Sequence, residues 1–187
     1  MKKIVLTFGL ISGGILAAMM LLTLAFTHNQ GYDYGEVFGY STMVLAFLLI
    51  FFGVRSYRDN VGGGRVGFWR ALAVGSLIGL VSSSCYVATW EVVYYSVMPD
   101  FMSKYEQHEL QRAREKGASE AVIAQKKAEM DNFARMYQNP AFNVAVTFME
   151  PLPVALVIAL FSAGVLSRRR KARPEDGGVL AGAGAAV

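Results

Sequence analysis

Long apolar segments alternate with polar connections along this chain. Four of these segments, 4–26, 37–54, 71–95 and 142–166, contain between 18 and 25 residues each. A hydrocarbon core about 30 Å thick needs roughly 20 helical residues, at about 1.5 Å per residue. Within that core every backbone amide and carbonyl needs a partner, and a helix supplies those partners within its own segment. The pattern therefore predicts an all-α, polytopic membrane protein with four transmembrane helices.

A charged connection, residues 99–140, separates the third apolar segment from the fourth. Pro99 suits the first turn of a helix, and Gly117 is typical of a helix end. Ser119 is a typical N-cap for a second helix, which would run to about Tyr137 before the chain breaks at Asn-Pro. We therefore expect a helical hairpin between the third and fourth spans.

Basic residues fall on alternate sides of the predicted spans. Lys and Arg are concentrated at positions 2–3, 55–70 and 168–173, whereas the connection 27–36 has none and 99–140 holds seven basic and seven acidic residues. Cytoplasmic flanks of membrane helices are enriched in Lys and Arg. Both termini are therefore predicted to be cytoplasmic, with the hairpin on the external side.

Composition adds the expected compartment. The formal net charge of +4 comes from these flanks and does not indicate nucleic-acid binding. The only cysteine, Cys85, lies within the third apolar segment, so no intrachain disulfide can form. Short loops and a two-lysine start favour a bacterial inner membrane, which would make the external side periplasmic. We expect one membrane domain, residues 1–171, in contact with the lipid bilayer, followed by a disordered cytoplasmic tail, residues 172–187.

A cleavable signal peptide is the alternative interpretation of the first segment, because Lys2 and Lys3 precede it and small residues lie near Ala25. Signal peptides have an apolar stretch of roughly 7–15 residues, and this one is longer. Its length favours retention as the first membrane helix.

The fourth span contains the one polar segment suited to binding or proton chemistry, Glu150-Pro151-Leu152-Pro153. A charged, unpaired carboxylate inside a membrane helix costs about 3 kcal/mol. The two prolines cannot donate to the carbonyls of Thr147 and Met149, which predicts a kink. Counting the helical rise from the polar loop that precedes the third span places part of that helix at the same depth as the carboxylate of Glu150. The predicted intramembrane polar site comprises Glu150, Pro151, Pro153, Ser83, Ser84 and Tyr86.

A structural kink is the favoured role for Glu150, and ion or proton handling is the alternative, because no charged partner is evident in the spans. Glu91 is predicted to lie at the outer interface, in contact with water. In the hairpin, Tyr105, Glu106, His108 and Glu109 do not form a metal site, because they include a single histidine. No metal or cofactor is predicted.

The second hairpin helix carries an apolar stripe at helical spacing. The stripe can pack on the protein's own bundle, which is the favoured interpretation, or it can contact an envelope protein or a second copy of the chain. Its candidate partner face comprises Ile123, Met130, Phe133 and Tyr137.

Several short motifs resemble one bacterial membrane family. They are 98–102 (MPDFM), 116–121 (KGASEA), 126–130 (KKAEM), 139–140 (NP) and 147–153 (TFMEPLP). With them the chain resembles the domain of unknown function 4199 family over nearly its whole length, from Lys2 to Arg170. The resemblance implies a Bacteroidetes-type inner-membrane protein and carries no established activity. Pro151 and Val122 depart from the family pattern, and Val122 replaces the acidic residue of a capping box.

Three functional classes remain. The first is a structural or interaction protein of the cell envelope that presents the hairpin in the periplasm. The second is a small transporter component that uses Glu150 for a proton or a cation. The third is an intramembrane enzyme, which the residues disfavour because no histidine or second buried acid accompanies Ser83, Ser84, Tyr86 and Glu150.

Overall fold

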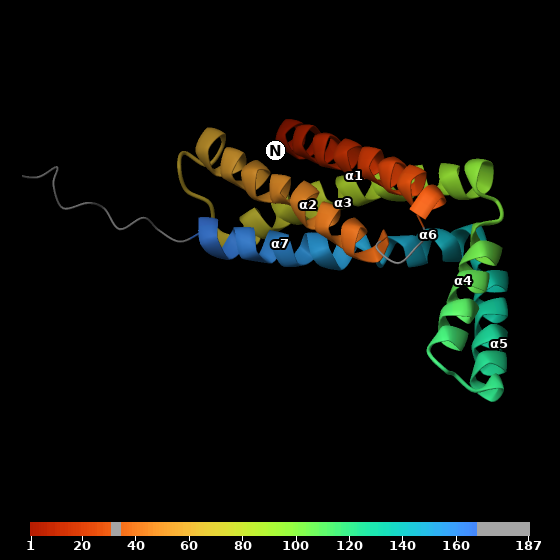
Figure 1. Ribbon diagram of the computed structural model, residues 1–187. Helices are drawn as coiled ribbons and strands as arrows, with labels where there is room; N and C mark the ends of the chain where they lie inside the picture. Colours follow the sequence, from red (N-terminus) through yellow and green to blue (C-terminus); the bar gives the residue numbers. More distant parts are fainter. Residues whose placement is uncertain (31–34, 168–187) are drawn as a thin grey trace, which may run out of the picture.

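The computed structural model describes residues 1–30 and 35–167, all of the ordered elements being helical (Figure 1). Three long helices come first: α1 (Lys2–Gln30), α2 (Gly35–Asn60) and α3 (Phe68–Val92), which continues into the π-helical turn η1 (Val93–Val97). Four shorter helices follow: α4 (Phe101–Glu115), α5 (Glu120–Tyr137), α6 (Pro140–Phe148) and α7 (Pro151–Leu166). The predicted tail, 172–187, and the last basic flank, 168–173, lie outside the described residues.

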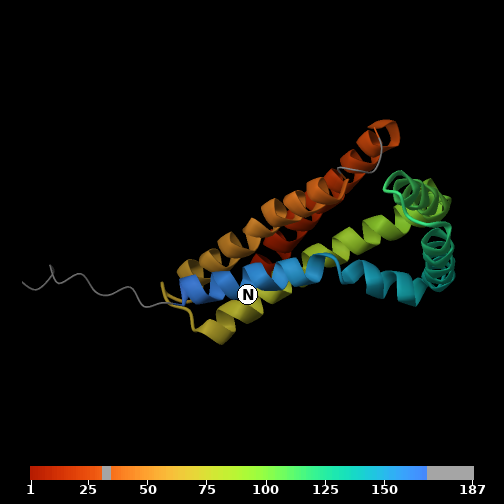
Figure 2. The same cartoon turned by 60° about the horizontal axis from the view of Figure 1, so that its bottom comes forward.

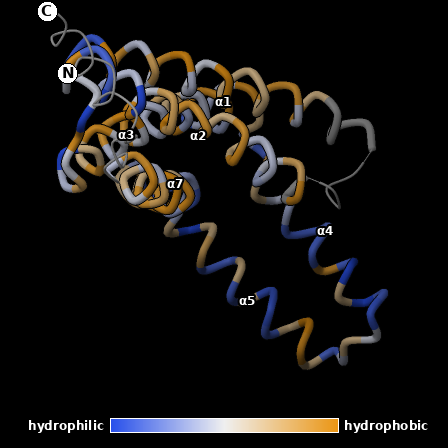
Figure 3. Tube along the Cα trace, turned by 90° about the vertical axis from the view of Figure 1, so that its left-hand side faces the viewer, coloured by the Kyte–Doolittle hydropathy of each residue, from blue (hydrophilic) through white to orange (hydrophobic). Residues whose placement is uncertain are grey.

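Four helical stretches are long and apolar enough to cross a membrane: Lys2–Ala25, Val37–Asn60, Phe68–Val97 and Pro140–Leu166. The fourth stretch combines α6 and α7. The predicted all-α fold with four membrane-length helices is thereby confirmed. Figure 3 shows the division of the chain, with apolar positions concentrated in the bundle and polar positions along α4 and α5.

Small residues bring α3 and α7 into close contact. A Cβ added at Gly79 would lie 2.8 Å from the Cβ of Ala155, and one added at Gly75 would lie 3.0 Å from the Cβ of Ala159. The contact moves from Gly75 to Gly79 along α3 while it moves from Ala159 back to Ala155 along α7. The two helices are therefore antiparallel. Figures 1 and 2 both show the two helices side by side. Such contacts are typical of helix packing in lipid, where close backbone approach replaces apolar burial.

Helix α1 is joined to the bundle by hydrogen bonds as well as by packing. The Ser12 hydroxyl donates to the carbonyl of Ala46 on α2 at 2.9 Å. The Ser82 hydroxyl on α3 lies 3.1 Å from the carbonyl of Gly9 on α1. Both serines are fully buried. These contacts join α1 to both α2 and α3.

The half of the bundle nearer the α2–α3 turn is closed by apolar side chains. We call this part the closed half, and the other end, from which α4 and α5 extend, the hairpin end. Eight residues in the closed half are 0 % exposed: Phe47, Ile50, Val54, Ala71, Val74, Ile78, Ala159 and Ala163. This core draws on α2, α3 and α7, and it contains no charged group among the described residues.

The predicted hairpin forms α4 and α5 with the expected signals at their ends. Gly117 adopts φ +77°, a backbone conformation that other residues rarely adopt, and it separates the two helices. The Ser119 hydroxyl accepts from the amide of Val122 at 3.5 Å, which makes it the N-cap of α5. Figure 1 shows the hairpin extending sideways across the end of the bundle.

The fourth membrane stretch breaks where the prolines predicted a kink. Helix α6 ends at Phe148 and α7 begins at Pro151, with Glu150 between them. The carbonyl of Thr147, to which Pro151 cannot donate, accepts instead from the amide of Glu150 at 3.4 Å, in the tighter turn that ends α6.

Two adjacent glycines on α1 provide a matched test of this packing. A Cβ at Gly13 would lie 2.6 Å from the Cβ of Cys85, whereas a Cβ at Gly14 would meet nothing within 4 Å. We expect Gly13→Leu to lower the free energy of unfolding by about 2 kcal/mol through overpacking, and Gly14→Leu to leave it nearly unchanged. Unfolding of the purified protein in mixed micelles measures both. Equal effects of the two substitutions would contradict the packing of α1 on α3.

Candidate functional site

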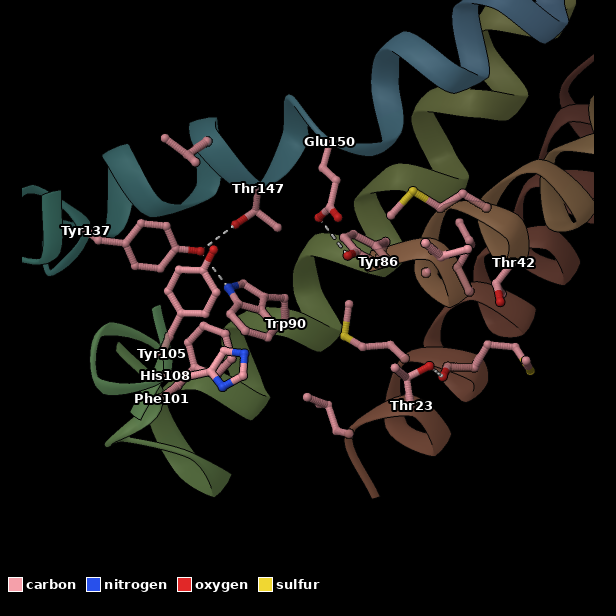
Figure 4. Close-up of a pocket in the computed structure, with 18 of the residues that line it drawn as sticks. Thr23, Thr42, Tyr86, Trp90, Phe101, Tyr105, His108, Tyr137, Thr147 and Glu150 are labelled. Carbon is pink, nitrogen blue, oxygen red and sulfur yellow. Dashed lines mark hydrogen bonds between the residues drawn. The ribbon is translucent and has the colours of Figure 1, made fainter. Parts of the chain in front are cut away.

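The Glu150 carboxylate contacts the third helix directly. The hydroxyl of Tyr86 on α3 donates to its Oε2 at 2.8 Å, as Figure 4 shows. The side chain of Glu150 makes no capping hydrogen bond to α7, although the residue stands at the N-cap position. The sequence predicted this neighbour by depth alone, and Tyr86 is the residue of that patch that makes the contact.

The other residues of the predicted polar site do not join this pair. The Ser84 hydroxyl donates to the carbonyl of Leu80, within its own helix, at 2.8 Å. The Ser83 hydroxyl is buried and has no hydrogen-bond partner in the described part of the chain. Pro151 is buried at the start of α7 and Pro153 is exposed. The prolines thus shape the backbone, while the polar chemistry belongs to Glu150 and Tyr86.

Glu150 and Tyr86 line a cavity of about 590 Å³ at the hairpin end of the bundle. Its remaining walls come from α1, α2, α4 and α6, with Tyr137 at the end of α5. Figure 2 shows α1 and α2 diverging from α3 and α6 toward the hairpin end, on either side of this space. Glu150 is an exposed residue of the protein because it borders this open space. The sequence placed Glu150 level with Tyr86, as the contact shows, but did not predict a cavity beside it.

The cavity walls differ in chemistry. Helix α1 contributes an apolar face, and α3 and α4 contribute aromatic rings. Trp90 and Phe101 meet edge to face, with centroids 4.9 Å apart, and Phe101 stacks on Tyr105 at 6.1 Å. Helix α4 also directs His108, Glu109 and Arg112 to the cavity. Four of the α1 residues, Leu16, Met19, Met20 and Leu24, recur at helical spacing, but that spacing alone does not distinguish a cavity wall from a lipid-facing stripe.

A chain of hydrogen bonds fastens the hairpin to two membrane helices. The indole N–H of Trp90 on α3 donates to the Tyr137 hydroxyl at the end of α5, at 2.8 Å. Tyr137 and Thr147 on α6 lie 3.1 Å apart, and Thr147 lies 3.2 Å from Oδ1 of Asn143. We call these four residues the Trp90 network; Figure 4 shows three of them.

The direction of the Trp90 network follows from its donors. Trp90 can only donate, and Thr147 gives its single hydrogen to Asn143, so the Tyr137 hydroxyl donates to Thr147. Burial raises the pKa of Tyr137, so this donor stays protonated. The network ends at Asn143, whose Nδ2 is buried without a hydrogen-bond partner in the described part of the chain.

Most side chains of the candidate partner face pack against other parts of this protein. Ile123 and Tyr137 are only 5 % and 6 % exposed. Phe133 is 38 % exposed, and its ring contacts those of Tyr137 and Phe142. Met130 is half-buried beside Met102 and Tyr105 of α4. The stripe therefore packs mainly on its own hairpin and bundle.

Ion pairs hold α4 against α5. Lys126 lies 2.7 Å from Glu109, and Lys127 lies 2.8 Å from Glu106 and 3.1 Å from Asp131. The hydrogen bond from Lys126 holds the pKa of Glu109 below its ordinary value. Exposed pairs of this kind stabilise weakly, so packing and the Trp90 network are the main constraints on the hairpin.

Glu91 is half-exposed, as a position at the edge of a span would be. One of its carboxylate oxygens, Oε1, is enclosed by protein and has no hydrogen-bond partner among the described residues. Within residues 1–30 and 35–167 no group of His, Cys, Asp and Glu side chains is arranged to hold a metal ion.

Comparison with known proteins identifies the family. A family model described as "Protein of unknown function (DUF4199)" matches residues 7–168. The chain belongs to this family. Searches of curated proteins and of solved structures found no match. The matched segment includes most of the first membrane-length stretch, the other three stretches, the hairpin and the cavity-lining residues, so the cavity lies within the family domain.

Tyr137→Phe tests the Trp90 network. The substitution keeps the ring but leaves the partly buried N–H of Trp90 unpaired and removes the hydrogen bond that the Thr147 hydroxyl accepts, so we expect it to lower the free energy of unfolding by about 1–2 kcal/mol. Hydrogen exchange should increase in α5 and α6. Tyr95→Phe, at a tyrosine that is 48 % exposed, is the control and should change neither quantity. Unchanged exchange in the Tyr137 variant would show that the network does not hold the hairpin.

Proposed function

We propose that the protein is a non-catalytic interaction protein of the bacterial cell envelope that presents its hairpin in the periplasm. The alternation of basic flanks supports this orientation. The attachment of the hairpin supports the role most directly, because Tyr137 links α5 to both α3 and α6 through hydrogen bonds. A hairpin held at a fixed angle to the membrane helices loses little conformational entropy when it binds a partner.

The contact surface that this proposal requires lies on α5. Val122, Phe133 and Met136 remain 53 %, 38 % and 43 % exposed, and their spacing places them on one side of the helix. This surface lies beyond the membrane-length stretches, so lipid does not account for its exposure. An envelope protein with a matching apolar helix or strand is the partner that we propose.

Site-specific crosslinking tests the interaction. We expect a photoreactive residue at Phe133 or Met136 to capture one discrete envelope protein in intact cells. The same residue at Ala124, on the opposite side of α5, should not capture it. A reciprocal crosslink from the identified partner back to α5 would complete the evidence. Crosslinks from Phe133 and Met136 that reach only this chain or lipid would reject the proposal.

Proton or cation handling through Glu150 is a second candidate, favoured by the position of its carboxylate on the cavity wall. The closed half weighs against it, because the fully buried apolar residues there offer no polar continuation toward the opposite end. Flux into proteoliposomes that is lost in the Glu150→Gln variant would support transport. Flux that is the same in both proteins, across a range of pH, would exclude it.

A further inference from the structure

The cavity at the hairpin end is open on one side and closed on the other. Its lining includes both apolar and polar side chains, and its volume of about 590 Å³ is typical of small-molecule sites. Below Glu150, the register of α3 on α7 brings Gly79 against Ala155 and leaves no space between the helices. A space with one closed end suits a molecule that binds and leaves by the same route.

The deep end of the cavity presents an acid. Tyr86 donates a hydrogen bond to Glu150 at 2.8 Å without neutralising the carboxylate, because a phenol is uncharged. A carboxylate on the wall of a cavity attracts a positively charged ligand group, and the attraction is stronger where less water screens it. An ammonium group would therefore be attracted to this position.

The aromatic wall favours the same ligand class. Trp90 lies one helical turn from Tyr86 on α3, and Phe101 and Tyr105 of α4 complete the wall. Aromatic faces attract ammonium groups, and the interaction strengthens when the site excludes water. An acid beside several aromatic rings is therefore a recognition site for a substituted ammonium rather than for a hydrated metal ion.

The charges at the mouth of the cavity do not favour an anion. Arg112 lies 3.7 Å from Glu109, which also binds Lys126 at 2.7 Å. The positive charge of Arg112 is thus partly balanced within the hairpin. His108 is the remaining nitrogen-bearing side chain on this wall, and it already has an interaction partner within the protein.

The wall opposite the aromatic rings suits an alkyl chain. Met19, Met20 and Leu24 share one face of α1, and Leu16 and Met43, which are each only 2 % exposed, lie behind them. Methionine side chains adapt to ligands of different shape, because they are unbranched and polarisable. The cavity therefore combines a site for a cationic head with a site for a hydrocarbon chain.

We propose that this cavity binds a long-chain ammonium amphiphile, with its head against Glu150, Tyr86 and Trp90 and its chain along α1. The ligand would enter from the lipid phase or from the hairpin side of the membrane. This site is separate from the α5 surface, so the proposal does not depend on a protein partner.

The two tryptophans provide the measurement. Trp90 lines the cavity, whereas Trp69 is 78 % exposed at the other end of α3. In vesicles of zwitterionic lipid, quenching of Trp90 by a brominated long-chain alkylamine is measured in the Trp69→Phe protein. The alcohol and the carboxylic acid of the same brominated chain are measured in parallel. Trp69 in the Trp90→Phe protein reports partition into the bilayer.

We expect the amine to reach half-maximal quenching of Trp90 at a concentration about tenfold lower than the alcohol, after correction for partition. Glu150→Gln should remove this preference, and Tyr86→Phe should reduce it. Glu91→Gln is the matched control, because it removes a carboxylate of the same helix bundle that does not line the cavity, and it should leave the preference unchanged.

Three results would overturn the proposal. They are equal quenching by all three compounds, stronger quenching by the carboxylic acid, and an amine preference that survives Glu150→Gln. Circular dichroism of each variant, and the Trp69 signal of the same substitution in the Trp90→Phe protein, establish folding and insertion, so a folding defect is distinguished from a loss of binding.

Discussion

The close contact between α3 and α7 is the constraint on which the rest of the structure depends. Gly75 and Gly79 allow Ala159 and Ala155 to approach so closely that an added methyl group would collide with them. This contact sets the register of the two antiparallel helices. Continued toward the hairpin end, the same register brings Tyr86 level with Glu150, where the hydrogen bond of 2.8 Å forms. The polar pair therefore owes its geometry to small residues located one to three turns away.

The break at Glu150 then separates a closed region from an open one. Below it, α7 packs on α2 and α3 with a fully buried apolar core. Above it, α6 follows a different direction from α7, and the hairpin holds the ends of α3 and α6 through Tyr137. Helices α1 and α2 take no part in these hydrogen bonds of Tyr137, and Figure 2 shows them diverging from α6. The cavity occupies the resulting space.

Local signals explain why much of this fold was predictable. The length of the apolar segments predicts the spans. Ser119 and Gly117 predict the ends of the hairpin helices, and the prolines beside Glu150 predict the break in the fourth span. Each of these features is determined by a few neighbouring residues. The level of Glu150 relative to Tyr86 was also predictable, because helical rise is constant and the polar flanks provide a reference.

The cavity and the Trp90 network were not predictable, because they depend on contacts between distant segments. In the sequence Tyr137 belongs to the apolar stripe of the second hairpin helix, and Trp90 lies 47 residues away; the fold places the indole nitrogen of Trp90 2.8 Å from the Tyr137 hydroxyl. The buried Oε1 of Glu91 likewise depends on the packing around the end of α3. The divergence of α1 and α2 likewise has no local signature.

The central claim is that one half of the bundle is open to a ligand and the other half is closed. Thiol labelling tests it most directly, in protein that lacks the native thiol through Cys85→Ala. Thr23→Cys lies on the cavity wall, and Val54→Cys lies in the closed half, where the side chain is 0 % exposed. A small hydrophilic reagent added to the hairpin side should modify Thr23→Cys and should leave Val54→Cys unmodified from either side. Modification of Val54→Cys in folded protein, or protection of Thr23→Cys, would contradict the account.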